Sequence, residues 1–153
     1  MLLLRLTAAL DRARVGYAVV GGYAVALHGA VRGTLDIDLV LRFDERQFQA
    51  AERALRSIGL EPRLPVTASD VFRFREEYVR NRNMTDWTFV NPARPSEIVD
   101  VILTRDLREI RVKRVKVRGS PVKLASIDDL IRMKIESNRP QDVEDVKALR
   151  KLR

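Results

Sequence analysis

The sequence predicts an α+β fold: a mixed sheet flanked by helices, with a helical hairpin at the C-terminus. Two observations lead to this prediction. Stretches with the alternation of strands are interspersed with stretches of helical period, and the residues after Ser126 show helical period only. At 153 residues the chain is long enough for one core. We therefore expect a single domain over residues 1–153, with a core at about 1–118 and C-terminal helices at about 126–152.

In the first half of the chain we expect three helices and two strands. The strand signal is short and apolar, whereas the helical signal is an amphipathic stripe. The expected helices cover residues 2–14, 23–29 and 45–57, and the expected strands cover residues 17–20 and 36–41.

The second half is expected to begin less regularly. Residues 60–83 predict one or two short strands around 71–74 and an exposed basic loop near 80–83. Strands at 86–90 and 97–103 are separated by a turn at Asn91-Pro92. Residues 111–118 alternate valine with basic residues, which predicts an edge strand. A capping box at Ser126 and Pro140 in a first helical turn predict the last two helices.

The composition limits the class of protein. The chain has no cysteine and one histidine, so disulfides, thiolate sites and a multi-histidine zinc site are excluded, and a reducing cytoplasm is expected. The apolar start is interrupted by Arg5 and Asp11, and no later apolar run is long enough to span a membrane.

The net charge of +8 favours polyanionic partners: nucleic acid, a nucleoside triphosphate or an acidic protein. The densest basic stretch is residues 105–118, with seven basic and two acidic residues. Two interpretations of this stretch stay open, a solvated hairpin surface and a surface that contacts RNA.

Gly21 and Gly22 stand between an expected strand and an expected helix. Backbone N–H groups at a helix N-terminus favour a phosphate, although two glycines also mark ordinary tight turns. Asp36 and Asp38 are two apart on the next expected strand, so both project from one face, roughly 7 Å apart. Such a pair is unfavourable unless a cation joins it, and Mg²⁺ prefers oxygen ligands. The alternative is an exposed strand start with two solvated aspartates.

The combined pattern resembles the signature of the polymerase-beta nucleotidyltransferase superfamily. Its parts are Val20-Gly21-Gly22, thirteen intervening residues and Asp36-Ile37-Asp38-Leu39. With His28-Gly29 and Arg32-Gly33-Thr34 added, the string is similar to the branch of AbiEii-like toxins and bacterial minimal nucleotidyltransferases. The resemblance implies a nucleotidyltransferase (EC 2.7.7 type) with two magnesium ions and a nucleoside triphosphate donor that is attacked at its α-phosphate.

The resemblance also implies a third carboxylate on a later strand. Asp100 is our first choice, because a lone aspartate inside an apolar strand requires a partner. Asp86 is the alternative. Asp36, Asp38 and Asp100 are thus the expected catalytic and metal-binding residues. The residues expected to bind the nucleotide are Gly21, Gly22, Arg32 and Thr34. The alternative for Arg32 and Thr34 is that they only shape the loop.

The C-terminal helices contribute Lys134, which falls in the middle of an apolar helical stripe and therefore needs an anion. One interpretation pairs Lys134 with Asp142 to hold the helical hairpin together. The other places Lys134 on the triphosphate with Asp142 behind it. AbiEii-like proteins carry a similar late Lys and Arg-x-x-Asp pattern, here Lys134 with Arg139 and Asp142.

Three functions remain open from the sequence. The first is nucleotide transfer to RNA, such as tRNA, or to protein, in a toxin–antitoxin system that includes a cognate protein partner. The second is transfer to a small molecule. The third is a non-catalytic antitoxin or nucleic-acid-binding module on the same fold. The presence of Asp36, Asp38 and Asp100 favours an enzyme.

Overall fold

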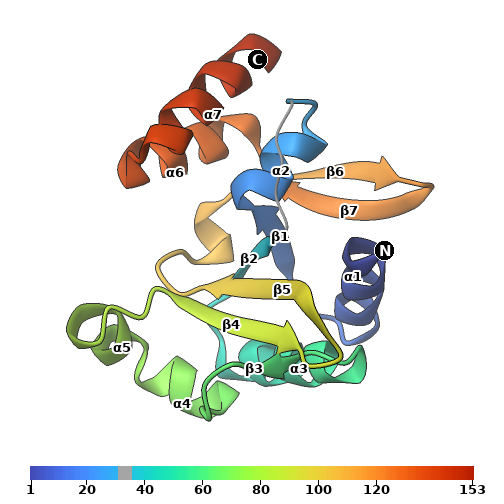
Figure 1. Ribbon diagram of the computed structural model, residues 1–153, viewed down its shortest axis with the longest axis vertical. Helices are drawn as coiled ribbons and strands as arrows, with labels where there is room; N and C mark the ends of the chain where they lie inside the picture. The colour runs from blue at the N-terminus through green and yellow to red at the C-terminus, as the bar shows by residue number, and fades with distance from the viewer. Residues whose placement is uncertain (31–35) are drawn as a thin grey trace.

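The computed structural model describes residues 1–30 and 36–153 and has one seven-stranded mixed sheet with helices around it (Figure 1). The strand order is β3-β4-β5-β2-β1-β7-β6. The strands are β1 (Tyr17–Val20), β2 (Ile37–Leu41), β3 (Glu61–Pro62), β4 (Asp86–Asn91), β5 (Arg94–Ile102), β6 (Val112–Val117) and β7 (Ser120–Ala125). This architecture confirms the expected α+β class.

The helices are α1 (Leu2–Arg12), α2 (Gly21–Leu27), α3 (Glu45–Ser57), α4 (Ala68–Arg73), α5 (Arg75–Asn81), α6 (Ile127–Ser137) and α7 (Pro140–Leu152), with a short 3-10 turn η1 (Leu107–Glu109). In Figure 1, α6 and α7 form a hairpin at one end of the molecule, whereas α3, α4 and α5 lie at the other. Among the described residues, no helix is long and apolar enough to cross a membrane.

The prediction of short strands around residues 71–74 is wrong, because this segment is helical as α4 and α5. The physical reason is a capping box at the start of α4: the Thr67 hydroxyl accepts from the Asp70 backbone N–H, and the Asp70 carboxylate accepts from that of Thr67. The expected basic loop is shorter than predicted, because α5 continues to Asn81.

The main core lies on one face of β2, β4 and β5. Side chains alternate along these strands, so Ile37 and Leu39, Trp87 and Phe89, and Val99 and Val101 are buried. Phe48 of α3 stacks on Trp87 with ring centroids 6.0 Å apart, which fixes α3 to this face. Asp38, Thr88 and Asp100, which lie between the members of these pairs, point to the opposite face.

The two C-terminal helices begin as the sequence predicts. The Ser126 hydroxyl accepts from the Asp129 N–H at the start of α6, and Pro140 occupies the first turn of α7. Strand β6 forms one edge of the sheet, as its alternation with basic residues predicts.

Candidate active site

Three polar residues form a row across neighbouring strands on the face opposite the core. Asp38 of β2 and Asp100 of β5 are register partners in parallel strands, and Thr88 of β4 is the antiparallel partner of Asp100. The Thr88 hydroxyl donates to Asp100 Oδ1 over 2.5 Å. One Asp100 oxygen is thus held by the neighbouring strand, which fixes the orientation of the carboxylate.

Asp38 also contacts the turn between β1 and α2. Gly21 has φ +68°, and a Cβ at this position would lie 2.0 Å from Asp38 Oδ2. No other residue fits there without moving the carboxylate, because both the backbone conformation and the space exclude a side chain. Gly21 therefore has a steric role that its position in the glycine pair did not reveal.

Asp36 precedes β2 by one residue, so Asp36 and Asp38 stand at the start of the strand as predicted. Asp86 is the first residue of β4 and pairs in register with Ile102, two residues beyond Asp100. These four aspartates line one cleft of about 750 Å³. Its other walls come from the Val20-Gly21-Gly22 segment, the end of β5 and the following loop, and the α6–α7 hairpin.

Burial and neighbouring carboxylates raise the pKa of three aspartates in the cleft, Asp36, Asp38 and Asp86. Burial, followed by the charges of Asp100, Asp86 and Asp36, raises the pKa of Asp38 to about 7, against an opposing effect of Lys134. Burial and the Asp100 charge also raise the pKa of Asp36 and of Asp86. The site therefore has an excess of negative charge that a cation would relieve.

The donor set fits a magnesium ion, because Asp38 and Asp100 offer oxygen ligands side by side and their neighbours add further carboxylates. Among residues 1–30 and 36–153, however, no three carboxylate or histidine side chains have the spacing of a formed metal site. The assignment of two magnesium ions to Asp36, Asp38 and Asp100 stays a prediction.

Lys134 is 6% exposed, and its ammonium lies between two carboxylates of α7. Its Nζ is 3.1 Å from Asp142 Oδ1 and 3.0 Å from Asp145 Oδ2. The expected pairing of Lys134 with Asp142 is therefore present. Lys134 also lines the cleft and acts electrostatically on Asp38, so this position does not exclude contact with a nucleotide.

Arg139 links the hairpin to the cleft. Its Nε and backbone N–H both donate to Asp142 Oδ2, over 2.9 Å and 3.0 Å, and its side chain reaches the cleft wall. Burial acts to raise the pKa of Asp142, but hydrogen bonds from Arg139, Lys134 and Ser137 outweigh it and hold this pKa well below its usual range. Asp142 is thus an anion that orients both Arg139 and Lys134.

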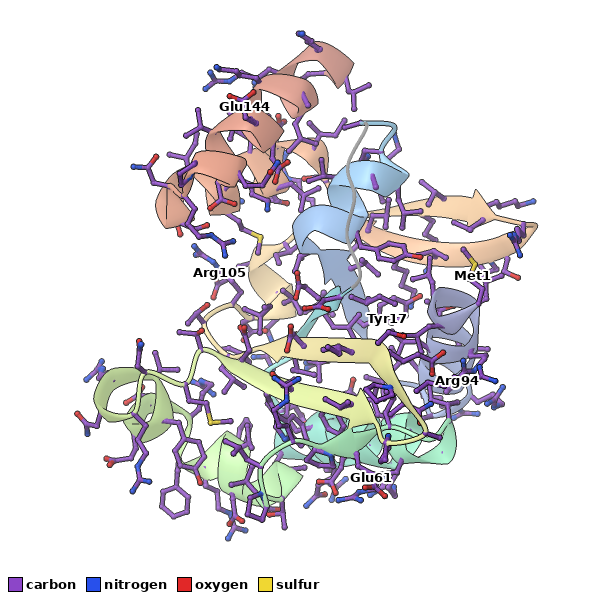
Figure 2. The ribbon with its side chains drawn as sticks, viewed as in Figure 1. Met1, Tyr17, Glu61, Arg94, Arg105 and Glu144 are labelled. Atoms are coloured by element: carbon purple, nitrogen blue, oxygen red, sulfur yellow. The ribbon has the colours of Figure 1, made fainter. Side chains whose placement is uncertain are left out.

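The structure brings the expected residues Gly21, Gly22, Asp36, Asp38, Asp100 and Lys134 to one cleft. Arg32 and Thr34 lie outside the described residues. The sequence reasoning missed Thr88 and the cleft residues Arg105 and Glu136, which form an ion pair. Figure 2 shows Arg105 between the C-terminal helices and the sheet. The period-two spacing of Asp86 and Thr88 was an available signal for Thr88, whereas Arg105 and Glu136 had none.

A comparison with known protein families gives the class of this protein. The family model described as "Nucleotidyltransferase of unknown function (DUF6036)" matches residues 2–151, so the chain belongs to this family and is a nucleotidyltransferase enzyme. The expected AbiEii-like branch stays a prediction. No curated protein matches the sequence.

Solved structures share the fold at low identity. The lincosamide antibiotic adenylyltransferase LnuA, bound to lincomycin, is similar with a TM-score of 0.65 and 12% identity, over 99% of this chain and 96% of that one. ANT(2″)-Ia in complex with adenylyl-2″-tobramycin has a TM-score of 0.60 and 17% identity, over 97% and 85%. A nucleotidyltransferase-like protein from Paracoccidioides brasiliensis has a TM-score of 0.61 and 19% identity, over 97% and 74%.

Asp38→Asn should stabilise the metal-free protein, and more so at higher pH. Because the folded pKa of about 7 lies above the ordinary value of 3.8, the folded state binds the proton more tightly, and stability falls as pH rises from about 4 to about 7. We expect a gain of a few kcal/mol above pH 7 and little gain near pH 4. Urea unfolding in EDTA across this pH range measures the gain in the free energy of unfolding. A gain independent of pH would contradict its origin in the raised pKa of Asp38.

Lys134→Met should lower the free energy of unfolding by about 3–5 kcal/mol, because it removes the buried cation that pairs with both Asp142 and Asp145. Lys147→Met is the matched control on α7: its pair with Glu144 is exposed and should contribute less than about 1 kcal/mol. Urea denaturation at neutral pH measures both. Equal losses would show that the Lys134 pairs do not stabilise the hairpin.

Proposed function

We propose that the protein is a magnesium-dependent nucleotidyltransferase that moves a nucleotide from a nucleoside triphosphate to RNA. The observation that carries the catalytic part is the row formed by Asp38, Asp100 and Thr88 on one face of the sheet. Burial and the neighbouring carboxylates raise the pKa of Asp38 to about 7, and such a set of oxygen ligands is suited to bind a divalent cation.

Different residues of the chain would bind the triphosphate donor and activate the acceptor hydroxyl. Asp36, Asp38 and Asp100 would hold magnesium, which when bound supplies positive charge to the triphosphate and lowers the pKa of a nearby hydroxyl. Gly21 and Gly22 would let the donor approach the backbone at the start of α2, where Val20 at the N-cap has no polar side chain to compete. Lys134 and Arg139 would face the phosphates from the opposite wall.

In the reaction, the acceptor hydroxyl oxygen attacks the α-phosphorus of the triphosphate. A new P–O bond forms, the bond between the α-phosphorus and its bridging oxygen breaks, and pyrophosphate leaves. Asp100 would accept the hydroxyl proton, because the hydrogen bond from Thr88 fixes one of its oxygens and orients the carboxylate. Asp38, against Gly21, would stay in place through the reaction.

The RNA acceptor is proposed from the net charge of +8. A small-molecule acceptor is the second candidate, and one observation favours it. The cleft volume of about 750 Å³ lies in the range of small-molecule sites, and two proteins of similar fold are an antibiotic adenylyltransferase and a protein with adenylyl-tobramycin bound.

Transfer assays distinguish the two acceptors. The protein is incubated with magnesium and each α-labelled triphosphate, together with total RNA or with a panel of aminoglycosides and lincosamides. We expect label on RNA with the wild-type chain and none with Asp36→Ala/Asp38→Ala. Label only on an antibiotic would select the second candidate. Absence of label with every acceptor would contradict the proposed transfer.

Asp100 and Asp86 should differ in importance. Asp100 is the register partner of Asp38, whereas Asp86 lies on the strand beyond it. We expect Asp100→Asn to lower kcat/KM by about 10³-fold or more and Asp86→Asn by less than about tenfold. Steady-state kinetics measure this, with melting curves as a folding control. The reverse order would make Asp86 the third carboxylate.

A further inference from the structure

The β6–β7 hairpin concentrates the positive charge of the chain. Residues 110–125 contain six basic residues and no acidic residue, and thus six of the eight excess positive charges. The hairpin extends away from the body of the molecule, with its tip free in Figure 1. A field focused in this way attracts a polyanion to one surface rather than to the whole protein.

Two like charges face each other across the hairpin. Arg114 of β6 and Lys123 of β7 are directly opposite in the antiparallel register, so their side chains leave the same face. Like charges in such a pair destabilise a sheet, whereas opposite charges or a Thr–Thr pair would stabilise it. The Lys123 ammonium lies 5.3 Å from the centre of the Tyr17 ring, so of these two cations Arg114 is the one that the fold leaves for an anion outside the chain.

The turn of the hairpin carries another basic residue at a position where it costs stability. Val117 pairs with Ser120, so Arg118 and Gly119 form the two-residue turn, with φ values of 49° and 81°. A turn with positive φ at both positions favours asparagine, aspartate or glycine at the first of them. Arginine is strained there, and it places another cation at the tip of the hairpin.

These cations lack protein partners. Within the described part of the chain, Lys113, Arg114, Lys116 and Arg118 are exposed and form no ion pair. Some exposed arginines elsewhere form pairs, such as Arg56 with Glu52 and Arg73 with Glu45. The hairpin therefore offers donors that only an anion outside the chain can use.

We propose that β6 and the Arg118-Gly119 turn bind the phosphate backbone of the acceptor RNA. This inference rests on the proposed function and adds the surface that holds its acceptor. Residues 110–125 contain no aromatic side chain, so the surface has neither a stacking platform for bases nor the aromatic anchors typical of protein interfaces. We therefore expect the surface to contact the phosphates of the RNA without recognising its bases.

The first test removes two charges. Arg114→Gln/Lys116→Gln is compared with Arg46→Gln/Arg53→Gln, which removes the same charge from exposed positions on α3, a helix that α1 separates from the hairpin in Figure 1. Both pairs are placed in the Asp36→Ala/Asp38→Ala background without triphosphate, so that binding is measured apart from catalysis. The probe is a fluorescein-labelled RNA stem-loop, followed by anisotropy.

We expect the hairpin variant to bind RNA roughly ten- to thirtyfold more weakly at about 0.1 M salt, and the slope of log K against log salt to fall by about one to two. The control variant should change affinity by less than about threefold. Equal losses in both variants would overturn the proposal, because they would show a response to net charge alone.

The second test uses the strained turn. Arg118→Asn should raise the melting temperature by about 1–3 °C, because asparagine tolerates this backbone, and should weaken RNA binding. A merely structural residue would not move stability and affinity in opposite directions. A variant that is more stable and binds RNA as well as wild type would overturn the role of the tip.

The remaining arms separate the partner and the proposed function. A DNA stem-loop of the same sequence and a polyglutamate of the same charge replace the RNA. Tighter binding of either one than of RNA would overturn the choice of RNA. If RNA binds through the hairpin but the wild-type chain labels no acceptor, the proposed transfer fails and the binding surface stands. If the hairpin variant transfers label to RNA as well as the wild-type chain does, the proposed transfer stands and the binding surface is overturned.

Discussion

The parallel pairing of β2 with β5 sets Asp38 and Asp100 side by side, and most of the described site depends on this contact. The backbone register, not a side-chain contact, holds the two carboxylates together. Their repulsion must be offset by the rest of the fold, since burial and the neighbouring charges raise the pKa of Asp38 to about 7. The hydrogen bond from Thr88 orients the Asp100 carboxylate, and the absence of a side chain at Gly21 leaves room for the Asp38 carboxylate.

On the opposite wall of the cleft, the buried charge is positive and carboxylates hold it in place. Lys134 is buried between Asp142 and Asp145, and Asp142 also accepts two hydrogen bonds from Arg139. This network positions cations toward the acidic face of the sheet. A triphosphate and its metal ion carry both signs of charge, so a cleft with one acidic and one basic wall suits them better than a cleft of either sign alone.

Most of the fold could be predicted from the sequence, because β1, α3 and the C-terminal caps follow local patterns. The apolar residues around 71–74 predict strands, but the capping box of Thr67 and Asp70 starts a helix there. The spacing of Gly21, Asp36 and Asp38 predicts that they lie together, and the resemblance together with the apolar strand around Asp100 predicts that Asp100 joins them. The structure brings these residues to one cleft, and their catalytic roles stay a prediction. The contact of Thr88 with Asp100 and the pairing of Arg105 with Glu136 depend on which elements are neighbours in space, which no local pattern specifies.

The connection between β2 and β5 also determines when in folding the site can exist. The segment that joins them contains α3, β3, α4, α5 and β4, so Asp38 meets Asp100 only after a long crossover has closed. Contacts this far apart in the chain form late and slowly. An N-terminal fragment emerging from the ribosome can contain Gly21, Asp36 and Asp38 and still have no complete cleft. Completion of the site is therefore coupled to completion of the sheet.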